Sequence, residues 1–220
     1  MLVATNIYKS YNSLQVLKGI DISVLEGEIV SIVGASGAGK STLLHILGTL
    51  DFPDRGTVKL REQSLFEMSA KELSSFRNRQ IGFVFQFHNL LPEFTAHENV
   101  CIPGFIGNRN ETEVRDQAEE LLIYLGMGSR LNHQPSQLSG GEQQRTAVAR
   151  ALINNPSIIL ADEPSGNLDS QNARELHQLF FDLRSKYRQT FIVVTHNEEL
   201  AKMTDRMLEI KDGRIQGVNE

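Results

Sequence analysis

Eight consecutive residues near the start of the chain could hold the phosphates of a nucleotide. They read Gly34-Ala35-Ser36-Gly37-Ala38-Gly39-Lys40-Ser41 and fit the pattern G-x-x-x-x-G-K-[ST]. Glycines let backbone N–H groups close around phosphate oxygens, and a helix N-terminus adds the positive end of its dipole. Lys40 supplies a full positive charge, and Ser41 offers a hydroxyl to Mg²⁺. We expect this loop, together with Thr42, to bind a triphosphate. A flexible glycine-rich turn is the alternative, but the apolar run before the loop and the helical pattern after it argue against that interpretation.

Two adjacent carboxylates follow an apolar run in the second half of the chain. Residues 158–161 predict a strand that delivers Asp162 and Glu163 to its carboxyl end, where ligands bind in open α/β sheets, and Pro164 then ends the strand. Adjacent carboxylates repel each other, so a divalent cation is an economical explanation. We expect Asp162 to bind Mg²⁺ and Glu163 to polarise an attacking water. A solvated acidic turn is the alternative when the pair is considered alone.

Three single residues are weaker candidates for the same site. His196 follows the apolar run 190–195 and could hydrogen-bond the terminal phosphate or the attacking water, although a structural histidine is the alternative. Gln86 follows the run 81–85 and could reach Mg²⁺ or water. Tyr11 could stack on adenine, with a core or surface aromatic residue as the alternative.

A second glycine-containing helix start has no strand of its own. The segment is Leu138-Ser139-Gly140-Gly141-Glu142. A capping box between Ser139 and Glu142 explains its ends but not its middle, because glycine in a helix costs about 1 kcal/mol relative to alanine. Glycines there let a phosphate approach free backbone N–H groups. A chain with one nucleotide cradle and two phosphate-binding helix ends suggests a head-to-tail dimer that shares ATP.

Composition excludes several classes of protein. The chain has 220 residues, and its 22 Lys and Arg against 27 Asp and Glu give a net charge of −5 without a basic stripe, so we expect no nucleic-acid partner. Cys101 is the only cysteine, which rules out an internal disulfide and favours a reducing compartment; a small buried hydrophobe is the simplest role for it. The first residues lack the apolar core of a signal peptide, and no run approaches the ~20 apolar residues of a membrane span, so direct membrane insertion is not expected.

The order of predicted elements indicates an α/β fold. Strand-like runs occupy the first third, helical patterns with capping residues at Ser69, Asn110 and Ser139 occupy the middle, and strands alternate with helices in the last third. Asp212-Gly213 predicts a hairpin near the end. We therefore expect a nucleotide-binding core with a mixed, largely parallel sheet and an N-terminal antiparallel β subdomain. Residues 1–86 and 156–220 would form the core and 87–155 an inserted helical subdomain, all within one domain.

Taken together, these segments resemble the ABC transporter ATPase family over essentially the whole chain. The matching motifs are the Walker A motif at Gly34–Ser41, the Q-loop at Gln86, the signature at Leu138–Glu142, the Walker B motif at Ile158–Glu163, the D-loop at Ser165–Asp169 and the switch histidine His196. The resemblance implies an ATPase that binds ATP and Mg²⁺. It also implies a homodimer in which Ser139, Gly140 and Gly141 of one subunit contact the γ-phosphate held by Lys40 of the other. On the same ground Gln86, Glu163, His196 and Lys40 are carried over as catalytic, Glu142 and Asp169 as nucleotide-binding, and Ser41, Gln86 and Asp162 as metal ligands.

Within this family the chain is similar to the lipoprotein-releasing ATPases and to the macrolide-exporter ATPases. Residues 85–100 look like the segment by which the lipoprotein-releasing type meets FtsX-like permeases of the LolC and LolE type, although a surface turn leading into a core helix is equally compatible with the composition. Ser165, His97 and Asn197 depart from the usual residues. The resemblance implies a peripheral protein on the cytoplasmic side of a bacterial inner membrane. An exporter or cell-division ATPase is the nearest rival. A soluble repair or translation ATPase would need a long insertion or a second cassette, and a P-loop kinase would leave the signature unexplained.

Overall fold

The computed structural model describes residues 1–219 and contains two compact units. Unit 1 consists of Met1–Ser74 and the residues from Leu183 onward, and unit 2 consists of Ser75–Asp182. The boundaries fall inside two helices, α2 (Ala70–Gln80) and α6 (Ser170–Tyr187). The predicted helical subdomain, residues 87–155, lies inside unit 2, whose bounds are wider; the subdomain division itself stays a prediction.

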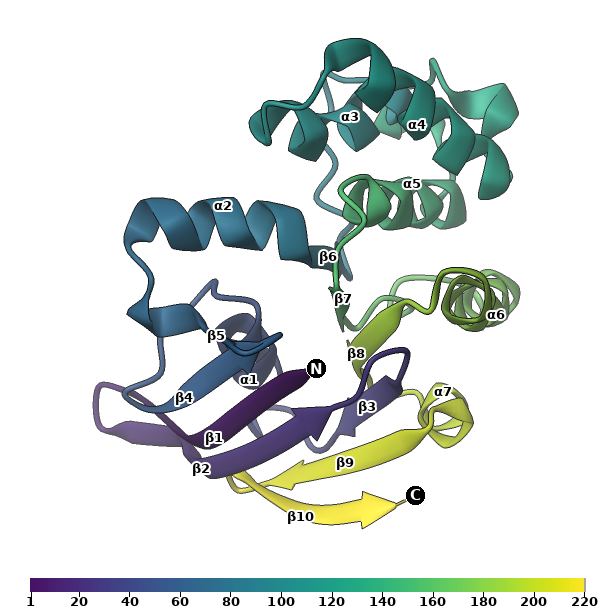
Figure 1. Ribbon diagram of the computed structural model, residues 1–220. Helices are drawn as coiled ribbons and strands as arrows, with labels where there is room; N and C mark the ends of the chain where they lie inside the picture. Colours follow the sequence, from purple (N-terminus) through teal and green to yellow (C-terminus); the bar gives the residue numbers. More distant parts are fainter. Residues whose placement is uncertain (220) are drawn as a thin grey trace. The chain divides into compact units, whose positions relative to one another are not determined.

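Unit 1 begins with an antiparallel sheet in the order β2-β1-β4-β5 (Figure 1). Its strands are β1 (Leu2–Tyr11), β2 (Leu14–Val24), β4 (Arg55–Leu60) and β5 (Gln63–Ser64). Alternate residues of β2, including Ile20, Ile22 and Val24, are buried, as period-two alternation predicts. The first strand continues to Tyr11, because its last residues still pair with β2.

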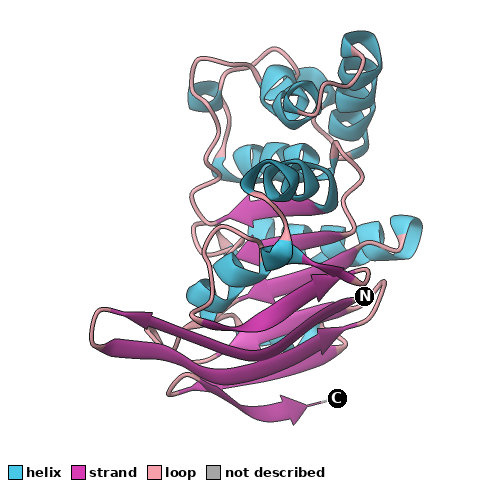
Figure 2. Ribbon diagram, turned by 60° about the vertical axis from the view of Figure 1, so that its left-hand side comes forward, coloured by secondary structure: helices cyan, strands magenta, loops and turns pink. Residues whose placement is uncertain are grey.

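A second set of strands in unit 1 lies in the order β10-β9-β3-β8. The strands are β3 (Ile29–Val33), β8 (Thr190–Val194), β9 (Arg206–Lys211) and β10 (Arg214–Asn219). β3 is parallel to both β8 and β9, and its nearly continuous burial is typical of a parallel strand covered on both faces. The predicted hairpin joins β9 to β10 (Figure 2), with Asp212 and Gly213 both at positive φ, as a type I′ turn requires.

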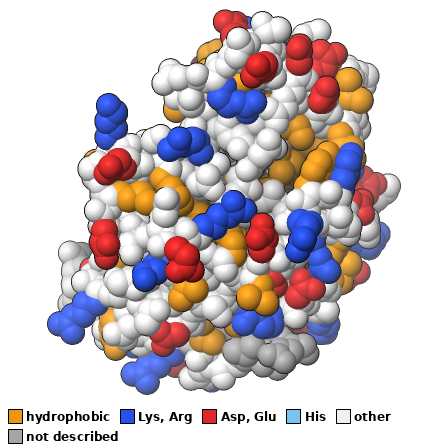
Figure 3. All heavy atoms as spheres, in the orientation of Figure 1, with side chains coloured by type: hydrophobic (Ala, Val, Ile, Leu, Met, Phe, Trp, Pro, Cys, Tyr) orange, Lys and Arg blue, Asp and Glu red, His pale blue; other side chains and the backbone are white. Residues whose placement is uncertain are grey.

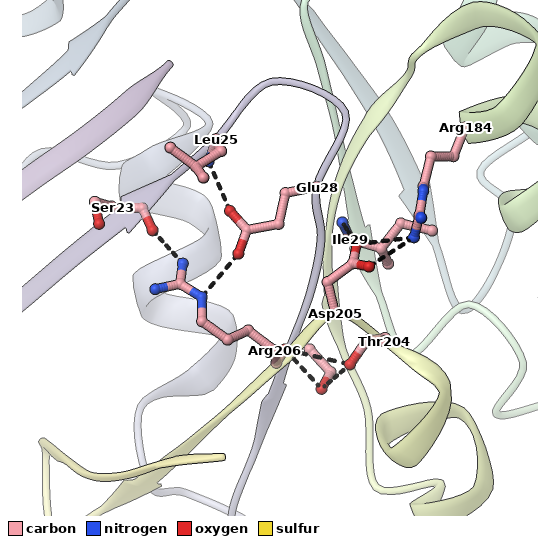
Figure 4. Close-up of polar contacts among 9 residues, drawn as sticks. Ser23, Leu25, Glu28, Ile29, Arg184, Thr204, Asp205 and Arg206 are labelled. Carbon is pink, nitrogen blue, oxygen red and sulfur yellow. Dashed lines mark hydrogen bonds and ion pairs between the residues drawn. The ribbon is translucent and has the colours of Figure 1, made fainter. Parts of the chain in front are cut away.

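Three helical elements and one polar junction complete unit 1. The helical elements are α1 (Lys40–Leu47), η1 (Leu65–Glu67) and α7 (Glu198–Met203). The junction ties β3 to the start of β9 (Figure 4). Arg206 donates to the Glu28 carboxylate at 2.7 Å and to the Ser23 carbonyl, while Asp205 accepts from the Ile29 amide at 2.8 Å and from Arg184.

Unit 2 combines a parallel strand pair with helices that pack on one another. β6 (Ile81–Phe85) pairs with β7 (Ile158–Asp162) in parallel. The helical elements are α3 (Ala96–Ile106), α4 (Glu111–Tyr124), η2 (Gly128–Arg130), η3 (Pro135–Gln137) and α5 (Gly140–Leu152). Helices α3, α4 and α5 contact one another, as Figure 1 shows. Apolar side chains of α5 and α6 are buried, including Val148, Leu152, Leu176 and Phe180, and so is Cys101.

The structure confirms the α/β class with an antiparallel N-terminal sheet, parallel strands and a helical middle. The capping residues predicted at Ser69, Asn110 and Ser139 all accept a hydrogen bond from the backbone of the first turn. Within residues 1–219 no helix has the length and apolar character needed to cross a bilayer.

Candidate functional site

The phosphate-binding loop of unit 1 adopts a conformation that requires its glycines. Gly34, Gly37 and Gly39 have φ values of 146°, 76° and 104°. A Cβ atom at Gly34 would collide with the Ile210 carbonyl oxygen, and one at Gly39 would lie 2.7 Å from the Leu17 side chain. The loop is therefore fixed by close contacts with β9 and β2 as well as by its own dihedral angles.

Lys40 and helix α1 supply the positive charge of the loop. The Lys40 ammonium group donates to the carbonyl oxygens of Gly34 and Ala35, at 2.9 and 3.0 Å, so it lies over the loop. Within the described residues no side chain caps the N-terminus of α1, and its N-cap is Gly39. The N–H groups of the first turn therefore point in the direction from which an anion binds a helix N-terminus.

His196 emerges at the same sheet edge as the phosphate loop. β3 and β8 are parallel, Ile32 is in register with Val194, and the Thr195 amide donates to the Ile32 carbonyl at 3.1 Å. Because Gly34 follows β3 and His196 follows β8, both leave the carboxyl ends of neighbouring strands. The structure thus brings these two predicted residues to one edge of unit 1.

Unit 2 brings Gln86 and the carboxylate pair together in the same way. Phe85, the last residue of β6, is in register with Asp162, so Gln86 follows one strand and Glu163 the other at a common edge. Glu163 has φ 46°, a left-handed conformation that is uncommon for a non-glycine residue and clusters at functional sites. Gln86 forms two hydrogen bonds with Asn167. The Gln86 side-chain amide donates to Asn167 Oδ1 at 3.1 Å, and the Gln86 backbone carbonyl accepts from Asn167 Nδ2 at 3.2 Å.

The D-loop is held by contacts within unit 2. Ser165 is hydrogen-bonded to the buried His177 at 3.0 Å. Asp169 caps α6, since its carboxylate accepts from the amides of Gln171 and Asn172 and from the Asn172 side chain. The Asn172 backbone and side-chain hydrogen bonds hold the pKa of Asp169 below its ordinary value. This aspartate is therefore an anion with a structural role in the chain itself.

The signature segment forms the predicted capping box, and its two glycines have different surroundings. The Ser139 side chain accepts from the Glu142 amide, and Glu142 accepts from the Ser139 amide at 2.8 Å. A Cβ at Gly141 would lie 2.5 Å from Asn172 Oδ1, so any larger residue there displaces the Asn172 side chain within this chain. A Cβ at the exposed Gly140 would meet only Leu168, at an ordinary 3.6 Å, so nothing in this chain requires that glycine.

Tyr11 is an exposed ring whose hydroxyl is anchored. The residue is 46% exposed, and its hydroxyl donates to Asp51 Oδ2 at 2.5 Å. The hydrogen bond to Asp51 raises the pKa of Tyr11 above its ordinary value. Burial alone would raise the pKa of Asp51, but hydrogen bonds from Lys9, Tyr11 and the Phe52 amide outweigh it and lower that pKa.

Sequence patterns did not identify four of the residues that support the site. Lys9 and Asp51 pair across about 40 positions, Asn167 lies between motif residues, and Arg150 donates to the carbonyl oxygens of Asn89 and His88 at 2.6 and 2.7 Å. Asn89 and His88 both have positive φ, which marks a strained loop. Asn167 lies inside the D-loop motif, so the motif could have identified it. No sequence pattern indicated the long-range pairs.

The segment after Gln86 exposes apolar side chains. Phe87, Leu91 and Phe94 are 74%, 43% and 41% exposed. Asn99 at the start of α3 is buried, donates to the carbonyls of Leu91 and Phe94 and accepts from the Leu91 amide, so the segment is a fixed turn. On the face drawn in Figure 3, Lys and Arg side chains are interspersed with Asp and Glu side chains.

The donor set fits Mg²⁺ in its chemistry. The expected ligands Ser41, Gln86 and Asp162 offer a hydroxyl, an amide and a carboxylate oxygen, and Mg²⁺ prefers a few protein oxygens together with phosphate oxygens. No group of three or more His, Cys, Asp or Glu side chains able to hold a metal occurs among residues 1–219. A metal ion that is also coordinated by the phosphates of a nucleotide does not need a group of three such side chains.

Comparison with known proteins identifies the class. A model of the ABC transporter family matches residues 17–166. The chain has the fold of the ATP-binding cassette MJ0796: a dimeric structure of a post-hydrolysis state bound to ADP and Pi is 40% identical, has a TM-score of 0.92, and is matched over 98% of its chain and all of this one. The chain belongs to the ABC transporter family and is an ATPase of that family.

Similar proteins of known type are ATP-binding proteins of lipoprotein-releasing systems. The lipoprotein-releasing system ATP-binding protein LolD of Cytophaga hutchinsonii is 63% identical over 215 residues, 98% of each chain. The LolD protein of Bacteroides thetaiotaomicron is 60% identical over 216 residues, 98% of this chain and 99% of the relative.

Proposed function

We propose that this protein is the ATP-hydrolysing subunit of a lipoprotein-releasing ABC complex in a bacterial inner membrane. The observation that carries the proposal is the 63% identity to a LolD protein across 98% of both chains. The protein would be peripheral on the cytoplasmic side and would power extraction of lipoproteins toward the outer membrane.

For ATP, we assign the phosphates to the Walker A loop and Lys40, and adenine to Tyr11. Ser41, Gln86 and Asp162 would hold Mg²⁺, which neutralises charge on the phosphates when bound. Glu163 would orient the attacking water, and His196 would hydrogen-bond the terminal phosphate. Lys40 lying over the loop and the strained backbone of Glu163 support these roles.

For the dimer, we propose a head-to-tail pair in which Ser139, Gly140 and Gly141 approach the nucleotide of the other subunit. Gly140 supports this arrangement, because no contact within the subunit requires a glycine at this position. Glu142 would hold the helix start: the side-chain hydrogen bond from Arg130, at 2.9 Å, keeps the pKa of that carboxyl below its ordinary value. Asp169 would act from the D-loop.

For the membrane partner, we propose that Phe87, Leu91 and Phe94 dock on FtsX-like permease subunits of the LolC and LolE type. Exposed apolar side chains on a fixed turn suit a protein partner. The turn follows Gln86 directly, so a permease bound there would act next to a proposed metal ligand.

The test uses Glu163→Gln in the isolated subunit for dimerisation and in the complex purified with its permease subunits for hydrolysis. The amide cannot orient water as a carboxylate does, so we expect ATP to bind, hydrolysis to stop, and an ATP-bound dimer to accumulate on gel filtration with Mg-ATP. Glu120→Gln, the same change at an exposed position of α4, is the matched control. Only monomer with undiminished hydrolysis would refute the role of Glu163. Failure of the wild-type complex to release a lipoprotein from proteoliposomes would refute the proposed cargo.

A further inference from the structure

The side chains of Lys9, Asp51 and Tyr11 form a compact cluster in unit 1. The Lys9 ammonium group lies 2.7 Å from Asp51 Oδ1, and it also donates to the Phe52 carbonyl at 2.7 Å. The Tyr11 hydroxyl donates to the second carboxylate oxygen at 2.5 Å. Asp51 therefore accepts one hydrogen bond from each of two side chains of β1, through separate oxygens.

The cluster is sheltered on one side and open on the other. The side chains of Lys9 and Asp51 are only 11% and 27% exposed, whereas Tyr11 is 46% exposed. Lys9 and Tyr11 both lie near the end of β1, and both side chains reach the Asp51 carboxylate. The ammonium group lies 5.1 Å from the Tyr11 ring centroid, within the range of a cation–π contact. The hydroxyl edge of the ring is fixed, while the ring retains exposed surface.

Asp51 is attached to the helix that begins in the phosphate loop. The amides of Leu50 and Asp51 both donate to the His45 carbonyl in the last turn of α1, at 2.8 and 3.3 Å. The first residue of α1 is Lys40. A hydrogen bond to Asp51 therefore holds the Tyr11 ring at a fixed place relative to the helix that carries the Walker A lysine.

Such a connection assists binding when the ring must be in place before a ligand arrives. An exposed aromatic side chain loses rotational freedom on binding, which costs about 0.5–1.5 kcal/mol, or roughly 2- to 12-fold in affinity. A ring already fixed by its hydroxyl does not lose that freedom.

We propose that Asp51, held by Lys9, is a positioning residue that fixes the Tyr11 ring for stacking on the base of the nucleotide. Base binding and phosphate binding are then aligned by the same helix, α1. This inference rests on the proposed function, in which Tyr11 stacks on adenine.

The experiment separates the base from the phosphates. Isothermal titration calorimetry compares Mg-ATP with Mg-tripolyphosphate, which has the phosphates without ribose or base. Asp51→Asn and Tyr11→Phe should each weaken ATP binding about 2- to 12-fold and leave tripolyphosphate binding unchanged. Asp116→Asn on α4, the same chemical change at an exposed position, should change neither affinity. A purely structural role for Asp51 would change both ligands together.

A double-mutant cycle gives the second measurement. In a Tyr11→Ala background Asp51→Asn should have no further effect on ATP, because the ring that it positions is absent. The inference is overturned if Asp51→Asn weakens both ligands equally, changes neither, or weakens ATP as strongly without the ring. If Asp51→Asn reduces the yield of folded protein, Tyr11→Phe alone distinguishes the same outcomes, because it removes the hydroxyl from the other side of the bond. Failure of the wild-type protein to bind either ligand would instead refute the proposed function, and this inference with it.

The protein has no tryptophan, which offers an independent readout. Tyr11→Trp places a single indole at the proposed stacking position. Its fluorescence should change on addition of ATP and not on addition of tripolyphosphate; an equal response to both would contradict stacking on the base.

Discussion

The two glycines of the signature segment allow the proposed head-to-tail dimer to be tested with one methyl group at a time. Gly140→Ala adds a Cβ whose nearest neighbour in this chain, Leu168, is 3.6 Å away. Alanine is favoured over glycine in a helix, so we expect the isolated subunit to gain up to about 1 kcal/mol, a Tm rise of about 2–4 °C. The folded subunit should be at least as stable as the wild type.

The same methyl group should weaken the ATP-bound dimer. A phosphate that accepts from the Gly140 amide needs the space that a Cβ would occupy, and a hydrogen bond to a charged group contributes about 1.5–3 kcal/mol. Loss of that bond corresponds to roughly 10- to 150-fold weaker dimerisation. Sedimentation velocity of the Glu163→Gln protein with Mg-ATP, with and without Gly140→Ala, measures the change directly.

Gly141→Ala is the matched comparison for subunit stability, and its expected effect is opposite. Its Cβ would lie 2.5 Å from Asn172 Oδ1, so the Asn172 side chain must move away from Asp169. We expect this variant to lower the Tm. If Gly140→Ala leaves the dimer intact while raising the Tm, no phosphate approaches that helix start and the proposed dimer is wrong.

Three further predictions follow from hydrogen bonds that sequence patterns did not reveal. Arg150→Lys should reduce stimulation by the permease more than basal ATPase activity, because lysine offers one nitrogen in place of the two guanidinium nitrogens that each donate to one carbonyl of the strained turn at His88; equal losses in the two assays would contradict this. Asp205→Ala should lower the free energy of unfolding in urea by about 1–3 kcal/mol, since it leaves the buried Ile29 amide without its acceptor, whereas Asp205→Asn should cost under about 1 kcal/mol. The lowered pKa of Glu142 stabilises the fold above its ordinary value of 4.5, and this stability is lost as the pH falls through the lower, folded-state value. Arg130→Gln should therefore flatten the fall of Tm with acidification below about pH 5, and an unchanged slope would contradict that assignment.

Local patterns predicted the elements well because their causes are local. Capping pairs three residues apart, the Asp212-Gly213 turn and the apolar strands each depend on neighbouring residues, and the structure has them where the sequence indicated. The motif residues at strand ends were likewise predictable, because parallel strands present their carboxyl ends at one edge.

Long-range pairs were not predictable, for a physical reason. Asp51 follows a helix and resembles an ordinary turn residue; its partners Lys9 and Tyr11 are on another strand, and only the fold brings them together. The contact that favours glycine at position 141 was also not predictable from the signature motif. The Asn172 side chain occupies the space beside Gly141, and the spacing of motif residues cannot show this contact.

The position of β3 has a consequence for synthesis of the chain. Both of its parallel neighbours, β8 and β9, are translated after all of unit 2. At about 5–20 residues per second, the apolar strand at Ile29–Val33 waits roughly 10 to 35 s on the ribosome before Arg206 emerges. Unit 2 can fold during that interval, while β3 keeps two unpaired edges that are open to misassociation. The nucleotide loop that follows β3 is thus assembled last, although it is translated among the first residues.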